Sequence, residues 1–417
     1  MRDIDDILRK YADLTIRIGL NLQPGQRLAI VGPLANGGVS LDAAPLVRCL
    51  TETAYRAGAS YVEAIWGDEA LQLARFSHAP RDSFEATSRW LGPALLDHVR
   101  AGDAVLMVFA NDPDLLGGHD PGQISMVQLA TARAFGPFRD LIAKNATNWT
   151  IVAAASAAWA RKVFPEAAPE VALARLWDAI ASLCRLDHPD PTAAWRAHLA
   201  TLDARKDHLN ARRYSALLYT GPGTNLTIGL PDRHVWVTGQ STSGNGILFA
   251  ANLPTEEVFT MPHKDRVDGI VSATKVLSYG GSLIEHVRLR FSGGRIVEAS
   301  ASAGEQVLRA LLATDEGAAR LGEIALVPQG SPISKSGLLF YSTLFDENAA
   351  SHLAVGSAYK CTLSGGEEMS DEDFDRAGGN RSLTHVDFMI GSGELDVDGR
   401  HADGTTEPVM RSGEWVT

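Results

Sequence analysis

The sequence predicts two domains of different class, an α/β domain with a mostly parallel sheet over residues 1–210 and an α+β domain over residues 211–417. The first observation is length, because 417 residues exceed what one hydrophobic core usually serves. The second is the alternation of helical segments with short apolar runs in the first half. The third is the alternation of apolar and polar residues, with a period of two, in the second half.

The first half reads as a series of strands joined by helices. The run "RLAIVG" follows the turn-forming residues "QPGQ", an order that favours a buried strand beginning at Arg27. Strands separated by helices need crossover connections, so the sheet should be mostly parallel. We expect further strands at 60–66, 104–110 and 149–155, and helices at 3–20, 42–58, 92–101, 122–143 and 189–214.

The second half is rich in strands of antiparallel character. The segment "HVRLRFSGGRIVEASA" reads as a hairpin with "SGGR" (292–295) as its turn. The segments "ALLYTGPGTNLTIGL", "HVWVTG" and "HVDFMIG" supply further strands. Helices are expected only near 303–314 and in parts of 346–360, so this half belongs to the α+β class.

Charge and cysteine content argue against several kinds of partner and site. The chain has 38 basic and 50 acidic residues, a formal net charge of −12, which disfavours nucleic acid and anionic membranes as partners. Its three cysteines are far apart and form no CxxC pair, so neither a disulfide framework nor a zinc–thiolate site is expected. The charged N-terminus lacks the apolar core of a signal peptide, and no run of about 18 apolar residues occurs. We therefore expect a cytoplasmic location.

The segment "THVDFMIG" is a candidate metal-binding strand. On a strand, His385 and Asp387 project from one face, and Val386 and Phe388 project from the other. An imidazole and a carboxylate about 7 Å apart along one face suit a shared metal ion or two adjacent ones. An edge strand with one solvated face explains the same pattern.

The stretch "LFDENAASHLAVGSAY" places polar side chains among small residues. On a helix, His352 and Tyr359 share a face two turns apart, whereas Glu347 lies about 140° away from His352. A single straight helix would not aim all three at one point, so either the helix begins after Glu347 or a metal ion lies near a helix end. Asp346 and Asn348 are both suited to the N-cap position. The alternative is a surface helix with polar outer positions.

Two further patches add carboxylates. The segment "TEEVF" offers Glu256 and Glu257, which point to opposite faces if it is a strand and could both be surface residues. Glu323 precedes the apolar run "IALV", where a carboxylate must be solvated, paired or bound to metal. Carboxylates and imidazoles without thiolates fit one or two hard-to-borderline divalent ions. A two-metal site activates water and polarises a carbonyl, as amide hydrolysis requires.

These patches resemble the aminopeptidase T metallopeptidases, the group that also contains aminopeptidase S. Four other segments share the resemblance: "GPGTNLTIGL", the closing "GEW", and "LNLQPGQ" and "AYRAGASYV" in the first half. The resemblance covers nearly the whole chain. It implies a cytosolic, homodimeric exopeptidase that removes N-terminal residues from peptide substrates with broad preference. It also implies two divalent ions, zinc, cobalt or manganese, held by the α+β half as the catalytic metal-binding domain.

The resemblance also implies roles for single residues. Glu323 and Asp387 would be carboxylates that bridge the two ions. Tyr359 matches the family's active-site tyrosine, either touching metal or acting on the transition state. The complete set of metal ligands that it implies is Glu257, Glu323, Glu347, His352, His385 and Asp387.

The sequence leaves open the mechanistic roles of two residues and two rival functions of the protein. Glu256 is our candidate general base, because it neighbours a ligand and need not be one, but it could equally point away. Tyr359 could donate a hydrogen bond to the developing oxyanion. One rival is another metalloenzyme on the same scaffold, such as a ring-cleaving dioxygenase, which would need iron(II) and open coordination positions. The other is a non-catalytic protein that binds a small ligand in its α/β half.

The acidic loop "GGEEMSDEDFDR" (365–376) lies between two candidate ligand patches. It could concentrate cations, including the α-ammonium group of a substrate, or cap the site. The alternative is a solvated surface loop.

Overall fold

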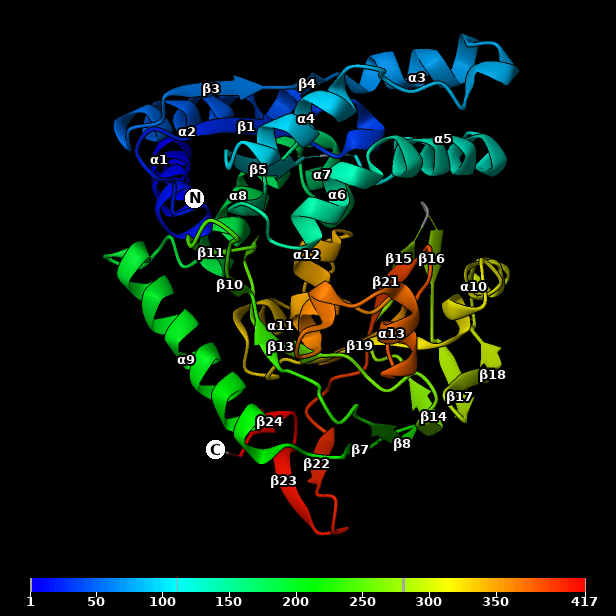
Figure 1. Ribbon diagram of the computed structural model, residues 1–417. Coiled ribbons are helices and arrows are strands. Elements are labelled where there is room, and N and C mark those ends of the chain that lie inside the picture. The colour runs from blue at the N-terminus through cyan, green and yellow to red at the C-terminus, as the bar shows by residue number, and fades with distance from the viewer. Residues whose placement is uncertain (1, 111, 280–281, 417) are drawn as a thin grey trace. The chain divides into compact units, whose positions relative to one another are not determined.

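The computed structural model describes residues 2–110, 112–279 and 282–416 (Figure 1). By its internal packing the chain forms two compact units. The first comprises Met1–His198 with Gln240–Pro254, and the second comprises Leu199–Gly239 with Thr255–Thr417. The division into separate domains at about residue 210 stays a prediction.

The first unit is built on a sheet in which neighbouring strands run parallel, in the order β12-β6-β5-β1-β3. The central strands β1 and β5 are apolar and largely buried, as is usual for a parallel sheet covered on both faces. The predicted α/β class with a mostly parallel sheet is confirmed. The strands are β1 (Arg27–Val31), β3 (Tyr61–Ala64), β5 (Ala104–Phe109), β6 (Trp149–Ala153) and β12 (Asn252–Leu253).

Helices connect these strands, and short strand pairs β2–β4 and β10–β11 complete the unit. The helix expected at 122–143 is two helices that meet at Phe135, because a proline in the first turn of the second starts a new helix there. No helix in the described ranges is both long and apolar enough to cross a bilayer. The elements are α1 (Ile4–Leu14), α2 (Ala44–Arg56), α3 (Glu69–His78), α4 (Leu91–Arg100), α5 (Pro121–Ala134), α6 (Gly136–Ala143), α7 (Ala157–Val163), α8 (Pro169–Leu183), β2 (Val39–Ser40), β4 (Trp66–Gly67), β10 (Gln240–Thr242) and β11 (Leu248–Ala250).

The second unit contains a large sheet whose neighbouring strands are antiparallel. The predicted "SGGR" hairpin is confirmed, since β17 and β18 pair there, and Gly293 and Gly294 have φ angles of 55° and 79°. In sheet order the strands are β18 (Arg295–Ser300), β17 (Arg288–Ser292), β14 (Val267–Ser272), β8 (Thr224–Gly229), β7 (Ala216–Gly221), β22 (Asp396–Arg400), β23 (Thr406–Arg411) and β24 (Glu414–Trp415).

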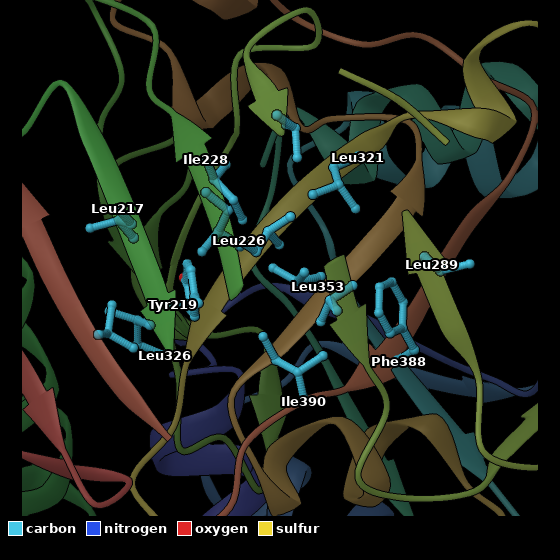
Figure 2. Close-up of a cluster of buried hydrophobic side chains, with 14 of the residues drawn as sticks. Leu217, Tyr219, Leu226, Ile228, Leu289, Leu321, Leu326, Leu353, Phe388 and Ile390 are labelled. Atoms are coloured by element: carbon cyan, nitrogen blue, oxygen red, sulfur yellow. The ribbon is translucent and has the colours of Figure 1, made fainter. Parts of the chain in front are cut away.

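A second antiparallel sheet of this unit shares a hydrophobic core with the first. Side chains from both sheets, among them Leu226, Leu289, Leu353 and Phe388, form one buried cluster (Figure 2). Burying such a side chain contributes roughly 1.5–3 kcal/mol, so the core fixes how the two sheets pack. In sheet order the strands are β21 (His385–Met389), β20 (His352–Gly356), β19 (Leu321–Leu326), β13 (Val258–Thr260) and β9 (Val237–Thr238). The α+β class is confirmed.

Few helices accompany these sheets, and two predictions about them are wrong. Helices also form outside the two expected segments, as α11 (Pro332–Ser336) and α13 (Asp371–Arg376). In the segment 346–360, α12 ends at Asp346, a 3₁₀ turn follows over Glu347–Ala349, and His352–Gly356 form strand β20. All five residues of β20 are buried, between β19 and β21. Small and apolar residues suit a buried strand as well as a helix, and pairing with two neighbouring strands decides between them. The remaining elements are α9 (Pro191–Arg212), α10 (Glu305–Leu312), α11 (Pro332–Ser336), α12 (Thr343–Asp346), α13 (Asp371–Arg376), β15 (Leu277–Tyr279) and β16 (Ser282–Ile284).

Candidate metal centre

Four candidate ligands lie on three adjacent strands of the second sheet. Glu323 on β19 is paired with Ala354 on β20, and Ala354 is paired with Asp387 on β21. Paired residues share a face of a sheet, as do residues two apart along one strand. His352 and His385 therefore project from the same face as this row. The predicted strand at "THVDFMIG" is confirmed, and the residues between the ligands enter the hydrophobic core.

The small residues of β20 let the ligands approach one another. Ala354 separates the two carboxylates of the row, and Gly356 is paired with His385. A Cβ added at Gly356 would lie 2.2 Å from the backbone oxygen of Thr384, and its φ of 108° disfavours other residues. A larger side chain at either position would separate the strands or fill the space between the ligands.

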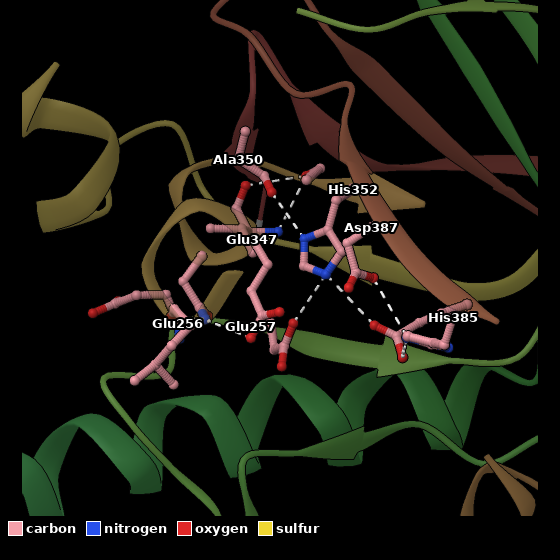
Figure 3. Close-up of polar contacts among 12 residues, drawn as sticks. Glu256, Glu257, Glu347, Ala350, His352, His385 and Asp387 are labelled. Carbon is pink, nitrogen blue, oxygen red and sulfur yellow. Dashed lines mark hydrogen bonds and ion pairs between the residues drawn. The ribbon is translucent and has the colours of Figure 1, made fainter. Parts of the chain in front are cut away.

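Each histidine faces two carboxylates (Figure 3). His352 Nε2 lies 3.2 Å from Glu257 Oε2 and 3.5 Å from Glu323 Oε1. His385 Nε2 lies 3.7 Å from Glu323 Oε2 and 3.5 Å from Asp387 Oδ1. The residues thus form two groups of three that share Glu323, and its two oxygens face different histidines.

These separations fit the spacing of ligands around a metal ion. Tetrahedral bonds of about 2.0–2.1 Å place neighbouring ligand atoms about 3.3–3.4 Å apart. The four nitrogen–oxygen separations in the centre are 3.2, 3.5, 3.5 and 3.7 Å. They are longer than most direct hydrogen bonds and match two ligands on one ion.

Backbone contacts hold both imidazoles in the orientation that a metal ligand needs. His352 Nδ1 donates to the carbonyl of Ala350 at 3.1 Å, and His385 Nδ1 donates to the carbonyl of Ser357 at 2.7 Å. With the proton on Nδ1, Nε2 has its lone pair directed at the carboxylates and is available to bind a cation.

The centre carries an excess of buried negative charge. Burial, together with the carboxylates of Glu257 and Asp387, raises the pKa of Glu347 well above its ordinary value. Burial also raises the pKa of Glu323. Burial would lower the pKa of His352, but the Glu257 and Glu323 carboxylates beside its Nε2 outweigh burial and raise that pKa well above its ordinary value. Protons are thus drawn into the cluster, which indicates a place for positive charge.

Glu347 enters the centre from the turn after α12, between two residues that fix that turn. Asp346 accepts hydrogen bonds from the amides of Phe340 at 2.7 Å and Ser342 at 3.0 Å, and burial raises its pKa to about 6. Asn348 donates to Glu347 Oε1 at 3.4 Å. Asp346 occupies the predicted N-cap position, but of the 3₁₀ turn Glu347–Ala349 and without a capping hydrogen bond from its side chain. Ser342 occupies the N-cap position of α12.

Glu256 lies at the edge of the centre and is buried. Neither it nor Glu257 is part of a strand, because β13 begins at Val258. In Figure 3 Glu256 lies on the side of Glu257 away from the histidines. Burial lowers the pKa of Arg205, although the nearby carboxylates of Glu414 and Glu256 oppose this change. The guanidinium carbon of Arg205 lies 4.9 Å from the ring of Trp415. Sequence patterns did not identify Arg205, because its link to this segment is long-range.

Tyr359 lies beside the second histidine. Its ring centroid is 4.8 Å from that of His385 and 6.4 Å from that of Phe259. The residue as a whole is 42% exposed, so part of it can be reached by a substrate. Burial of the surrounding site and the carboxylates of Glu323 and Asp387 raise the pKa of Tyr359 well above its ordinary value, which keeps it a hydrogen-bond donor.

A cleft opens beside the centre. Glu347 and Asp387 form part of its wall, and Leu277, Met389 and Tyr341 contribute apolar and aromatic surface. A substrate group in this cleft would therefore touch two candidate ligands and an apolar wall at once.

Cations pair with several carboxylates of the acidic loop at 365–376. Asp371 is 3.0 Å from Lys360 and 2.7 Å from Arg381, and Asp375 is 2.5 Å from Lys264. These pairs favour the interpretation as a surface loop over that of a reservoir of free negative charge.

Comparison with known proteins places the chain in a family. Residues 4–415 match the profile of the thermophilic metalloproteases, family M29. The chain belongs to this family. Among M29 relatives, aminopeptidase T of Thermus thermophilus is 48% identical over 409 residues, and aminopeptidase AmpS of Bacillus subtilis is 45% identical over 409 residues. Each alignment covers 98% of this chain and 98% of the relative, which confirms the resemblance seen in the motifs.

Solved structures agree with this assignment. Wild-type AmpT from Thermus thermophilus matches with a TM-score of 0.92 and 47% identity, covering 99% of both chains. A 2,5-dihydroxypyridine dioxygenase from Pseudomonas putida matches with a TM-score of 0.52 and 13% identity, over 99% of this M29 chain and 97% of the dioxygenase. At that identity the likeness concerns the fold alone.

Proposed function

We propose that this protein is a metal-dependent aminopeptidase, a hydrolase that removes N-terminal residues from peptides at the centre on β19, β20 and β21. The observation that carries the proposal is M29 membership over residues 4–415, with relatives named aminopeptidases at 45% and 48% identity. The site supports it independently, since two groups of metal-type ligands share one carboxylate.

The ligand set that we propose has six members. Five of them lie in the two groups around the histidines, and Glu347 is directed at the same carboxylates. The set holds four carboxylates, with a charge of −4 when ionised, and two neutral imidazoles. Two divalent ions supply +4, which would offset the buried charge. We propose Glu257, Glu323, Glu347, His352, His385 and Asp387 as ligands of two ions, zinc, cobalt or manganese.

Bound ions of this kind would activate water and polarise the scissile carbonyl. The residues of the chain would orient the peptide substrate and donate or accept its protons. We propose that the Tyr359 hydroxyl donates to the oxygen of the scissile carbonyl as charge develops there, because the tyrosine is accessible and kept protonated. The cleft beside Glu347 and Asp387 would receive the N-terminal residue.

Glu256 is retained as the proposed general base because it is adjacent to a ligand. A base must come within hydrogen-bond reach of the proton that it removes. Arg205, which carries the opposite charge, is close to Glu256. A Glu256→Gln variant should keep its bound ions and lose most of its turnover. If turnover is unchanged, Glu256 supports the segment and takes no part in proton transfer.

The alternative is a different metalloenzyme on the same scaffold, such as a ring-cleaving dioxygenase. The structural likeness to a dioxygenase is a likeness of fold. Six protein ligands leave few positions open on a single iron, whereas two hydrolytic ions use them all. This arrangement favours the aminopeptidase.

The experiment that tests the function uses metal-stripped protein reloaded with each candidate ion. A peptide with a free N-terminus and its N-acetylated form are compared as substrates, with metal content measured on the same samples. An aminopeptidase should cleave the free peptide only, and only after reloading. Equal cleavage of both peptides would indicate an endopeptidase, and oxygen consumption with one bound iron would indicate a dioxygenase.

Two further proposals concern the state of the protein in the cell. We propose a homodimer, because the family resemblance implies one, and light scattering on the purified chain measures it. We also propose a cytoplasmic location, supported by three separated cysteines without a disulfide. Fractionation of expressing cells tests the location.

A further inference from the structure

Asn348 links two segments that each carry a proposed ligand. Its Oδ1 accepts a hydrogen bond of 2.7 Å from the backbone amide of Glu256, the neighbour of Glu257. Its Nδ2 donates to the carbonyl of Leu344 at 3.2 Å and to Glu347 Oε1 at 3.4 Å. The asparagine is completely buried.

The orientation of this carboxamide is set by its partners. The amide of Glu256 can only donate, and the carbonyl of Leu344 can only accept, so Oδ1 and Nδ2 cannot exchange places. Moving the side chain would leave a buried donor and a buried acceptor unpaired, which is strongly unfavourable. Asn348 is therefore a rigid bridge between the two segments.

The bridge opposes a repulsion within the centre. Glu257 is buried and Glu347 is partly buried, and both lie on segments outside the paired strands. When ionised, the two carboxylates carry like charge. Like charges in a low-dielectric site push apart unless the backbone holds them. A carboxamide holds both segments and adds no charge of its own, which an aspartate at the same position could not do.

We propose that Asn348 is a positioning residue that sets the distance between Glu257 and Glu347 and so preorganises the centre for cation binding. This inference rests on the proposed function, because it takes both glutamates as ligands. Loss of the bridge should weaken ion binding more than it weakens the fold. Orienting partners of this kind typically alter metal affinity 10- to 100-fold.

The test uses Asn348→Leu, which keeps the volume without the hydrogen bonds, and Asn348→Asp, which keeps the acceptor and adds charge beside Glu347. Binding of Zn²⁺ alone to the metal-stripped full chain is measured by calorimetry, with folding checked by circular dichroism. We expect a 10- to 100-fold weaker affinity in both variants. Turnover lost at low Zn²⁺ should return at higher Zn²⁺.

The matched control is Asn380→Asp. Asn380 is a buried asparagine of the same unit, and its Nδ2 donates to the carbonyls of Gly317 at 2.8 Å and Gly356 at 2.6 Å. Its side chain makes no described contact with a proposed ligand. This variant should melt at a lower temperature than the parent and bind Zn²⁺ with the parent's affinity.

The outcomes separate the inference from the function on which it rests. If the parent protein binds Zn²⁺ and cleaves peptides, and a folded Asn348 variant binds Zn²⁺ equally well, the inference is overturned. If the Asn380 variant loses the same affinity, general loosening of the unit explains both, which also overturns it. If the parent neither binds ions nor cleaves peptides, the proposed function fails. Should the leucine variant not fold, the aspartate variant decides.

Discussion

Replacing Glu323 by glutamine changes the centre at the one residue that both ligand groups share. Glu323 Oε1 faces His352 at 3.5 Å, and Oε2 faces His385 at 3.7 Å. Glutamine has the same shape, but one oxygen becomes an NH₂ group, which cannot bind a cation. The variant should therefore lose the shared ligand and keep its fold.

The expected size of the effect follows from linkage between ion binding and stability. At an ion concentration about 1,000 times Kd, binding stabilises the folded protein by about 4.1 kcal/mol. Changes to orienting residues alone weaken metal binding 10- to 100-fold, so we take about 100-fold for a direct shared ligand. At the same ion concentration the variant then gains only about 1.4 kcal/mol. The difference of about 2.7 kcal/mol corresponds to roughly 5–10 °C in melting temperature for a unit of 150–250 residues.

The assay compares melting temperatures of Glu323→Gln and the parent, each with ions and with a chelator. Glu298→Gln is the control, because it makes the same change in an exposed ion pair of the same unit, between Glu298 on β18 and Arg290 on β17. The control should keep the whole ion-dependent shift and the peptidase activity. Glu323→Gln should lose most of both. Full activity and a parental ion-dependent shift in Glu323→Gln would refute the assignment of this centre.

Three further predictions test other parts of the structure. The buried hydroxyl of Tyr219 has no hydrogen-bond partner in the described structure, so Tyr219→Phe should raise the free energy of unfolding by about 1 kcal/mol. A lower urea midpoint in the variant would contradict this. Burial would raise the pKa of Asp315, but hydrogen bonds from the Leu383 amide and the Ser382 hydroxyl outweigh it and lower that pKa. The contribution of ionised Asp315 to the free energy of unfolding is therefore complete above about pH 4 and disappears as the pH falls through the lowered pKa. The loss of unfolding free energy in Asp315→Ala, measured with urea, should therefore be smaller at pH 3 than at pH 7. An equal loss at both pH values would contradict this. Tyr359→Phe should lower kcat about 10²- to 10³-fold with ion content unchanged, whereas loss of an ion would make the tyrosine a ligand.

The classes of the two halves and the residues of the centre could be predicted from the sequence. The pattern of apolar residues is a local property, so "RLAIVG" as a strand and "SGGR" as a hairpin turn could be recognised from those segments alone. The parallel direction followed from the helices between the strands. The side chains of the centre could be named because carboxylates and imidazoles at these motifs match the family's pattern. The two-residue step from His385 to Asp387 also predicted their shared face.

Prediction from the local sequence pattern failed where the same residues suit both a helix and a strand. "HLAVG" is small and apolar, and the helix expected there is strand β20 because β19 and β21 pair with it on both sides. The five-residue step from Glu347 to His352 is explained by this change of structure, since the first lies in a turn and the second on a strand. Likewise, residues 252–253 join the first unit's sheet through pairing with β6, a partner far away in sequence.

The sequence by itself determined which chemistry is present, because residue types and short-range periodicity are written along the chain. Only the tertiary structure decided how that chemistry is assembled. The row of Glu323, Ala354 and Asp387, the two histidines held by backbone carbonyls, and the bridge at Asn348 all depend on strand register and on contacts between distant segments. Register is set by the packing of the whole sheet against its core, a cooperative property that no single segment contains.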